Sequence, residues 1–96
     1  KIPEFLEEMK KVASESYRVL KKNKFCAILI GDTRQKGCMI PLGFSVMQVF
    51  QDAGFTLKEI IIKEQHNCQA TGYWKTSSLK YNFFLIAHEY LLVFRK

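Results

Sequence analysis

Proline and glycine are scarce in this sequence, with two prolines and five glycines among 96 residues. Because 48% of the residues are hydrophobic, the chain can form a packed core and is not a disordered tail. The apolar runs, such as Cys26–Ile30 and Leu91–Phe94, are far shorter than the ~20 residues that a membrane-spanning helix needs. At 96 residues the chain is at most one small domain or a piece of a larger one.

Cysteine and histidine are also few, and their spacing offers little to a metal. The three cysteines, Cys26, Cys38 and Cys68, form no C-x-x-C pair, which is the spacing typical of zinc and redox sites. His66 and Cys68 are the one close pair of soft ligands, and a metal site would have to recruit Cys38 or His88. We therefore expect no metal site, with Cys26 in a core strand and the other two cysteines in loops.

The N-terminal segment carries acidic residues where a signal peptide would carry its apolar stretch. We therefore expect a protein of the reducing cytosol rather than a secreted one. Basic residues outnumber acidic ones by 15 to 9, which gives a net charge of +6. This excess favours a polyanionic partner without identifying it.

Apolar residues at three- and four-residue spacing predict two helices, from Pro3 to about Lys22 and from Pro41 to Ala53. Four apolar residues of the first helix are expected to be core: Phe5, Met9, Val12 and Leu20. Acidic residues in the first turns of this helix would stabilise the positive end of its dipole. Arg18, Lys21 and Lys22 in the last turn would stabilise the negative end. Gly54 is well placed to end the second helix in a left-handed conformation.

Three segments are predicted to be strands: Phe25–Ile30, Phe55–Gln65 and Phe83–Phe94. A helical connection makes the first two parallel, and a return after a loop makes the last antiparallel to its neighbour. Because both faces of the last strand are largely apolar, we expect it to be central, between the other two. The first strand is apolar on both faces and should be covered on both, so an open edge there would indicate missing neighbours.

Two polar segments connect these elements. Thr33–Cys38 is expected to be a loop in which Gly37 allows the chain to bend. His66–Asn82 is expected to be a longer loop that contains no acidic residue.

Three segments together resemble one known family: Tyr17–Lys22 (YRVLKK), Cys26–Arg34 (CAILIGDTR) and Phe83–Lys96 (FFLIAHEYLLVFRK). They are similar to segments of S-adenosylmethionine-dependent DNA amino-methyltransferases, which make N4-methylcytosine or N6-methyladenine. The resemblance extends in order over essentially the whole chain, and its last segment is the most specific. It implies an α/β protein with a partial Rossmann-like methyltransferase fold: a three-stranded mixed sheet, an antiparallel final strand and two helices.

The resemblance also implies which parts of such an enzyme are absent. The family's catalytic motif is an Asp, Ser or Asn followed by Pro-Pro and an aromatic residue, and its cofactor motif is a Phe-x-Gly-x-Gly-like turn. This chain has two isolated prolines and no G-x-G. We therefore expect residues 1–96 to be the C-terminal part of a catalytic domain, inactive alone. S-adenosylmethionine would bind only to the complete enzyme. The resemblance also implies that this enzyme acts in the cytosol of a bacterium or archaeon, as part of a restriction–modification system.

A candidate site follows the first predicted strand, at the kind of strand end where α/β sheets bind ligands. By resemblance, Asp32 and Thr33 would form a wall of the pocket that receives a flipped base. Arg34 and Lys36 would hold DNA phosphate. The alternative is that Asp32 caps the turn after the strand and that Arg34 is solvated.

The segment His66–Asn82 is the stronger candidate for DNA contact, because it joins stacking surface to positive charge. The residues proposed for this contact are Asn67, Gln69, Tyr73, Trp74, Lys75 and Lys80. Alternatively, the aromatic residues of this segment tuck against the core. His88 and Glu89 lie within the last strand and are expected to form structural hydrogen bonds rather than to act in catalysis.

Two functions are compatible with these residues. The first is a fragment of a site-specific DNA amino-methyltransferase, with DNA and the rest of the methyltransferase domain as partners. The second is a stand-alone, non-catalytic, basic module that binds nucleic acid and keeps half of the methyltransferase fold. A Pro-Pro-aromatic motif upstream of Lys1 would indicate the fragment, whereas a start codon near Lys1 would indicate the module. In both cases an open sheet edge makes self-association an expectation.

Overall fold

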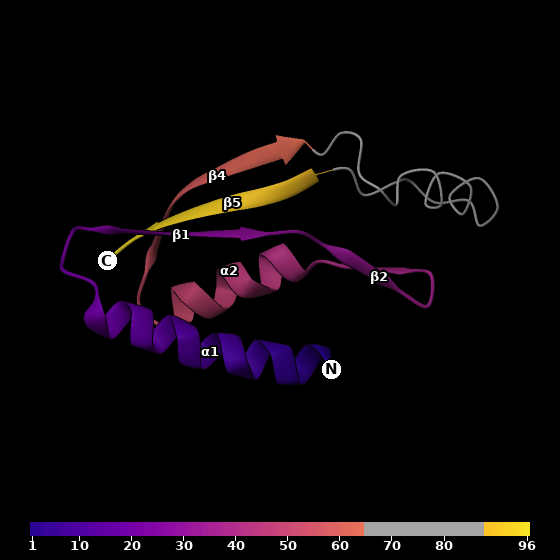
Figure 1. Ribbon diagram of the computed structural model, residues 1–96, viewed down its shortest axis with the longest axis horizontal. Helices are drawn as coiled ribbons and strands as arrows, with labels where there is room; N and C mark the ends of the chain where they lie inside the picture. Colours follow the sequence, from indigo (N-terminus) through magenta and orange to yellow (C-terminus); the bar gives the residue numbers. More distant parts are fainter. Residues whose placement is uncertain (65–87) are drawn as a thin grey trace.

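The computed structural model describes residues 1–64 and 88–96 of the chain. These residues form two helices, a three-stranded sheet and a two-stranded hairpin. In Figure 1 the helices lie on one side of the sheet and the hairpin lies beyond the sheet's end. Neither helix in these residues is long and apolar enough to cross a membrane. The elements in chain order are α1 (Ile2–Val19), β1 (Phe25–Ile30), β2 (Thr33–Gln35), β3 (Cys38–Ile40), α2 (Leu42–Asp52), β4 (Thr56–Glu64) and β5 (His88–Arg95).

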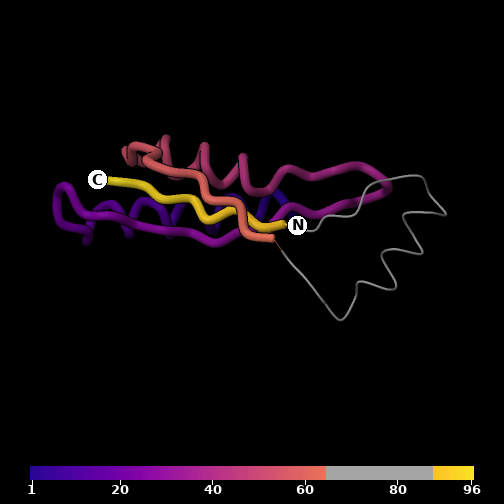
Figure 2. Tube along the Cα trace, turned by 90° about the horizontal axis from the view of Figure 1, so that it is seen from above, coloured from indigo at the N-terminus to yellow at the C-terminus, as the bar shows by residue number. Residues whose placement is uncertain are grey.

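β5 is the central strand of the three-stranded sheet. The strand order is β1–β5–β4, with β5 between the other two in Figure 2. Both outer strands run antiparallel to β5, so that β1 and β4 point in the same direction, as their arrowheads in Figure 1 show. The predicted insertion of the final strand between the other two is therefore confirmed, together with the two helices. The part of the predicted last strand that precedes His88 lies outside the described residues.

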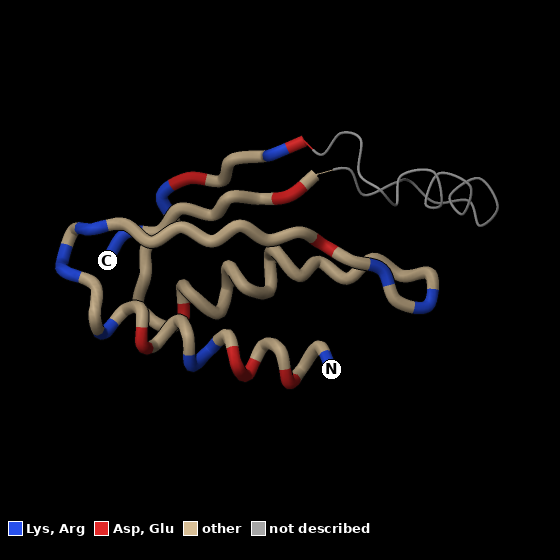
Figure 3. The backbone as a smooth tube through the Cα atoms, in the orientation of Figure 1, with Lys and Arg blue, Asp and Glu red and all other residues tan. Residues whose placement is uncertain are grey.

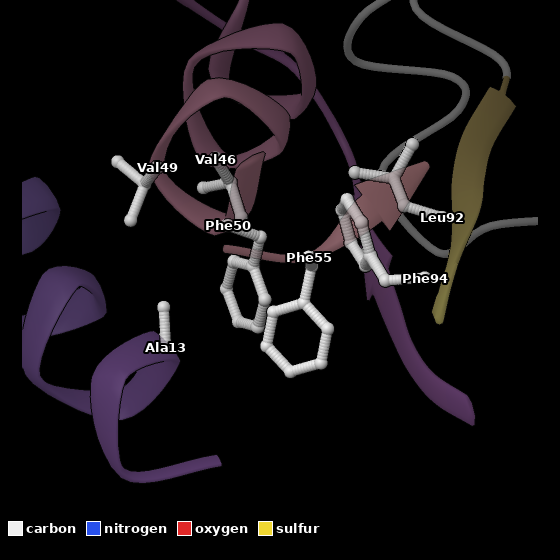
Figure 4. Close-up of a cluster of buried hydrophobic side chains, with 7 residues drawn as sticks. All are labelled: Ala13, Val46, Val49, Phe50, Phe55, Leu92 and Phe94. Carbon is white, nitrogen blue, oxygen red and sulfur yellow. The ribbon is translucent and has the colours of Figure 1, made fainter. Parts of the chain in front are cut away.

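The core lies between the two helices and the sheet face that they cover. Phe50 and Phe94 are stacked with ring centroids 5.1 Å apart, and Phe55 lies 5.7 Å and 5.8 Å from them. Such ring pairs contribute about 0.5–1.5 kcal/mol beyond the area they bury, and here they join α2 to the central strand. Figure 4 shows the buried cluster, which consists of Ala13, Val46, Val49, Phe50, Phe55, Leu92 and Phe94.

The opposite face of the sheet has no helix over it in the described part of the chain (Figure 1). Phe25 and Leu29 of β1 are 55% and 51% exposed, and Ile61 of β4 is 48% exposed. The register places Leu29, Leu91 and Ile61 in one apolar row across the three strands. The expectation that β1 is covered on both faces is thus met on one face only, and β1 forms an edge of the sheet.

Helix α1 ends earlier than predicted. Leu20 already has extended backbone, and Asn23 has a positive φ of 68°, so the chain turns before β1. Lys21 and Lys22 therefore lie beyond the helix, and Arg18 is the basic residue of its last turn. The helix dipole accounts for Arg18 but not for the two lysines.

The predicted apolar stripe of α1 is only partly core. Phe5 and Val12 are 38% and 46% exposed, whereas Ala13 is fully buried. Met9 and Leu20 pack partly buried against the core. The prediction of core positions is therefore wrong for Phe5 and Val12, because the side of α1 that carries Ala13 faces α2 (Figure 4).

The predicted polar loop Thr33–Cys38 is mostly a β-hairpin. β2 and β3 pair antiparallel with Gln35 opposite Cys38, which leaves Lys36 and Gly37 as a two-residue turn. Both residues have positive φ, 52° and 78°, as a type I′ turn requires, and this turn matches the twist of paired strands. Gly37 makes the bend as predicted, but the loop is corrected to a hairpin and Cys38 lies in a strand.

Helix α2 matches its prediction closely. It begins directly after Pro41 and ends at Asp52. Gly54 follows with a φ of 120°, which confirms its predicted left-handed conformation. A Cβ at Gly54 would lie 2.9 Å from the Tyr17 ring, so α1 and the end of α2 are in close contact there.

Candidate functional site

Asp32 stands where β1 ends, and its carboxylate joins three elements. Oδ1 accepts a hydrogen bond of 2.8 Å from the backbone N–H of Gly43 in the first turn of α2. Oδ2 accepts one of 3.2 Å from the Tyr90 hydroxyl on β5. Both carboxylate oxygens are therefore engaged, and the site is already built around this side chain.

The contact with Gly43 supplies a cap that α2 lacks within its own sequence. Pro41 precedes the helix and makes no side-chain cap. The first N–H groups of a helix have no partner inside it, and its N-terminus carries partial positive charge. The Asp32 carboxylate satisfies one of these N–H groups and complements that charge. The alternative predicted for Asp32 is a cap of the turn directly after the strand, whereas the carboxylate caps α2, eleven residues further along the chain.

Tyr90 extends the cluster to His88. Burial first, then the negative charge of Asp32 and the hydrogen bond to it, raise the pKa of Tyr90. The phenol therefore keeps its proton at neutral pH and donates it to Asp32. The Tyr90 oxygen also lies 3.1 Å from His88 Nε2. Because the hydroxyl has one proton and gives it to Asp32, His88 must be the donor in this second contact.

The ring of Tyr90 is held on its faces as well as at its hydroxyl. An ideal Cβ on Gly43 would lie 2.5 Å from the ring carbon Cδ2, so this ring occupies the space that any larger residue at position 43 would need. Phe44 stacks on Tyr90 with centroids 5.4 Å apart and an interplanar angle of 28°, and it is itself 48% exposed. We call these five residues the Asp32 cluster: Asp32, Gly43, Phe44, His88 and Tyr90.

The remaining predicted site residues near Asp32 lie on the hairpin. Thr33 and Arg34 are half-buried on β2, opposite Ile40 and Met39 of β3. Lys36 is exposed in the turn. Six further residues predicted to contact DNA lie outside the described residues: Asn67, Gln69, Tyr73, Trp74, Lys75 and Lys80. The DNA-contact and base-pocket roles of all these residues stay predictions.

Sequence reasoning missed Tyr90 and Gly43 as members of the site. The one sequence signal for them is that no Ser, Thr, Asp or Asn directly precedes α2. The first N–H groups of this helix therefore require a hydrogen-bond acceptor from elsewhere in the chain. His88 contacts Tyr90, and Glu89 forms a 3.5 Å ion pair with Lys63. The first contact lies within β5, and the second joins β5 to β4.

Cysteine and metal chemistry have little support in the described part of the chain. Burial raises the pKa of the Cys26 thiol, which keeps it in the unreactive protonated form. Within residues 1–64 and 88–96 no three His, Cys, Asp or Glu side chains are grouped as metal ligands.

The glycines of the described residues do not form a turn that could approach a nucleotide-like cofactor. The space beside Gly43 is filled by Tyr90, and that beside Gly54 is filled by Tyr17. Gly37 forms the hairpin turn. Glycine-rich cofactor turns keep this space open so that the backbone can approach the ligand, and Gly37, Gly43 and Gly54 do not form such a turn.

Comparisons with known proteins identify relatives of the chain. A family model described as DNA methylase matches residues 1–96. Structures of one protein from Thermus thermophilus, named "Putative DNA Modification Methylase", are similar over 98% of this chain. Its selenomethionine form and its complex with S-adenosyl-L-methionine are each 25% identical, with TM-scores of 0.75 and 0.76. A third structure of it is 23% identical, with a TM-score of 0.76.

The likeness covers only part of that relative. This chain corresponds to 37% of the Thermus chain in the first two structures and to 36% in the third. The chain thus spans little more than a third of the length of this Thermus protein. No curated protein sequence matches the chain significantly.

Proposed function

The chain belongs to the DNA methylase family, and we propose that it forms part of the target-base pocket and DNA surface of a site-specific DNA amino-methyltransferase. The complete enzyme would transfer methyl from S-adenosylmethionine to N4 of cytosine or N6 of adenine. The observation that carries this proposal is the family match over all 96 residues. It is supported by the likeness to a methylase structure that holds S-adenosyl-L-methionine.

The position of the Asp32 cluster supports a role at the base pocket. Ligands of open α/β sheets bind beyond the carboxyl ends of the strands, and Asp32 follows the carboxyl end of β1. Since its oxygens already bind Gly43 and Tyr90, we assign Asp32 the role of a positioning residue. It would hold the start of α2 and the base of the hairpin in place as one wall of the pocket, with Thr33 beside it.

The hairpin supports a role in DNA contact. It projects beyond the sheet and carries Arg34 and Lys36 (Figure 3). Cationic side chains that hold phosphate position a protein on DNA without reading its sequence. A two-stranded ribbon is also narrow enough to lie in a DNA groove.

Cofactor binding and methyl transfer are assigned to parts of the enzyme outside this chain. S-adenosylmethionine would supply the methyl group, but among the described residues Gly37 forms a turn and Gly43 and Gly54 allow close packing. Catalytic residues would come from the family's Pro-Pro-aromatic motif, which this sequence lacks. The chain's own residues would shape the pocket, orient the flipped base and exclude water from it.

The uncovered sheet face supports the assignment to part of a larger domain. Phe25, Leu29 and Ile61 are about half exposed, so burying the rest of each would contribute roughly half of the about 1.5–3 kcal/mol for a fully exposed side chain. The rest of the methyltransferase domain would cover this face and pair with the edge of β1. The share of the Thermus methylase that this chain leaves unmatched is large enough to do so.

Methyl transfer tests this division of labour directly. The 96-residue chain and the complete protein that contains it would each be incubated with labelled S-adenosylmethionine and duplex DNA. We expect transfer by the complete protein only, and nucleoside analysis of its product would show N4-methylcytosine or N6-methyladenine. Transfer by the short chain alone would contradict the proposal, as would a complete protein that modifies another position.

Salt dependence tests the hairpin separately. In the complete protein, Arg34→Ala with Lys36→Ala should flatten the plot of log association constant against log salt by about 0.9 per lost phosphate contact. The control removes two cations that are paired with Glu7 and Glu8 on α1, Lys10 and Lys11. An unchanged slope for the hairpin variant would remove the hairpin from the DNA surface.

A further inference from the structure

A second group of basic residues lies at the opposite end of the sheet from Asp32. β1 begins there, β5 ends there, and Phe25, Arg95 and Thr56 are paired in register across the three strands. Figure 3 shows Lys and Arg positions concentrated at this end of the backbone. We call it the basic end, and it comprises Lys21, Lys22, Lys24, Lys58, Arg95 and Lys96.

The basic end has no acidic partners among the described residues. The ion pairs between side chains in this part of the chain join Lys10 to Glu7, Lys11 to Glu8, Arg18 to Glu15 and Lys63 to Glu89. The hydrogen bond and charge of Glu7 raise the pKa of Lys10 most, and the charge of Asp52 adds a smaller effect, which places Asp52 near α1. Lys96 is held by the Tyr17 carbonyl, 2.5 Å from Nζ, and its ammonium lies 4.7 Å from the Tyr17 ring centroid.

Local structure does not account for this concentration of charge. α1 ends at Val19, so its dipole cannot explain Lys24 in the turn before β1, nor Lys58 and Arg95 in the sheet. Cations that lie close together repel one another, although in the strand register Arg95 faces Phe25 and Thr56 rather than another cation. A bound polyanion would offset this repulsion.

The backbone holds these cations in a defined arrangement. The Lys96 N–H donates to the Lys24 carbonyl over 3.0 Å, and the Asn23 N–H donates to the Lys96 carbonyl over 3.4 Å. In β4 the register shifts between Leu57 and Glu59, so that Lys58 is the extra residue of a β-bulge. Bulges re-aim side chains at the ends and edges of sheets. Cations at the basic end thus come from three places: the turn after α1, the end of β5 and the start of β4.

We propose that the basic end is a second, sequence-independent contact for the phosphates of duplex DNA, separate from the hairpin. Neighbouring strands are about 4.8 Å apart, and B-DNA carries about one negative charge per 1.7 Å of its axis, so both surfaces have closely spaced charges of opposite sign. The identification of the polyanion as DNA rests on the proposed function. A contact of this kind holds the protein on DNA without selecting a sequence and raises its local concentration near target sites.

The test compares two triple variants of the chain with equal loss of charge. One is Lys22→Gln, Lys24→Gln and Lys58→Gln at the basic end. The other is Lys10→Gln, Lys11→Gln and Lys63→Gln, which removes cations that are already paired with glutamates. Binding to a duplex of random sequence would be measured by fluorescence anisotropy between about 50 and 200 mM salt, a range over which phosphate contacts weaken strongly.

We expect the basic-end variant to lose about 0.9 in salt slope for each contact removed, and the control to lose much less. Equal slopes for the two variants would overturn the proposal. Thermal unfolding excludes a folding defect, because removal of repelling charges should leave the basic-end variant at least as stable as the unsubstituted chain. Duplex DNA should raise the unfolding temperature of the unsubstituted chain more than that of this variant.

The hairpin variant Arg34→Ala with Lys36→Ala separates this proposal from the proposed function. If the hairpin variant alone flattens the salt slope, DNA contact by the basic end is refuted and DNA contact by the hairpin is supported. If the basic-end variant alone does so, the reverse holds. Binding to phosphatidylserine vesicles without binding to DNA would refute the DNA contact and assign the basic end to a membrane surface.

Discussion

At the scale of single residues, one carboxylate links backbone structure to the candidate site. Asp32 caps α2 through the Gly43 N–H and accepts a hydrogen bond from the Tyr90 hydroxyl. Loss of either carboxylate oxygen would therefore leave a hydrogen-bond donor without its acceptor. A half-buried polar group that loses its partner costs about 1–3 kcal/mol. The cluster therefore fixes the end of β1, the start of α2 and the middle of the sheet relative to one another.

The Tyr90 hydroxyl contributes to stability in a pH-dependent way. Its pKa is raised in the folded chain by burial, by the charge of Asp32 and by the hydrogen bond to it, relative to the ordinary value of 10.0. The stabilisation is therefore complete below pH 10 and is lost as pH rises through the raised pKa. Tyr90→Phe keeps the ring against Gly43 and Phe44 but removes the hydroxyl. We expect it to lower the free energy of unfolding by about 1 kcal/mol at neutral pH.

Urea denaturation from neutral pH to about pH 11 measures both effects. The difference in unfolding free energy between the original chain and Tyr90→Phe should shrink above about pH 10. Tyr17→Phe is the matched control, because the Tyr17 hydroxyl makes no hydrogen bond to the described residues while its ring packs on Phe55. A constant difference across this pH range would show that the Tyr90 hydroxyl is not bound to a charged group.

At the scale of elements, the hairpin β2–β3 depends on its two-residue turn. Gly37 has a φ of 78°, and a Cβ there would meet nothing within 4 Å, so Gly37→Ala tests backbone strain alone. We expect it to destabilise the hairpin by about 1–2 kcal/mol, because a left-handed conformation is unfavourable for a residue with a Cβ. Lys36 has a φ of 52°, and Lys36→Asn should strengthen the turn because asparagine favours this position of a type I′ turn.

Amide hydrogen exchange of β2 and β3 reports these changes where they occur. Protection should fall in Gly37→Ala and rise in Lys36→Asn, while protection in β5 stays the same in both. Lys36→Asn also loses the charge proposed to contact phosphate, so its DNA affinity should fall although the hairpin is more stable. Parallel changes in protection and affinity would mean that hairpin order, rather than the Lys36 charge, governs DNA binding.

The elements that sequence patterns predicted best are those with long apolar periodicity. α2 and the central position of β5 are determined by buried residues such as Val46, Phe50 and Phe94, which the spacing alone identifies. The hairpin was missed because Lys-Gly is a weaker turn signal than Asn-Gly or Asp-Gly. The end of α1 was missed because Lys21 and Lys22 favour helix, whereas the backbone at Asn23 decides where the chain turns.

The candidate site was predictable in place but not in its contacts. Asp32 was identified by its position after an apolar strand, which is a local signal. Its bonds to Gly43 and Tyr90 depend on how α2 and β5 come together in space, at separations of 11 and 58 residues. Periodicity shows which face of a strand is buried but not which polar groups meet across it.

At the scale of the whole molecule, one face of the sheet consists of apolar side chains that are typical of a protein core but are exposed here. The row formed by Leu29, Leu91 and Ile61 crosses all three strands, and β1 leaves one edge without a partner strand among the described residues. Contiguous apolar surface of this kind marks a site of protein contact. In the proposed enzyme, the rest of the domain makes that contact.

The 96-residue chain alone should therefore self-associate through this face. We expect concentration-dependent dimers or larger species in sedimentation velocity, and we expect Leu29→Lys with Ile61→Lys to make the chain monomeric, because charges at the centre of the apolar row oppose its burial. Both residues are about half exposed, so the substitutions should change the free energy of unfolding of the monomer by less than about 1 kcal/mol. Val12→Lys, at a position that is 46% exposed on α1, is the control and should leave association unchanged.

The same pair of substitutions should have the opposite consequence in the complete protein. There the row would be buried against the rest of the domain, and two buried charges without partners would destabilise it by several kcal/mol. A complete protein that unfolds at the same temperature with and without Leu29→Lys and Ile61→Lys would show that this face stays open to solvent. A short chain that is monomeric before substitution would show that the face does not drive association. Either result would locate the missing contacts at the edge of β1 instead, where pairing relies on backbone hydrogen bonds and tolerates these side-chain changes.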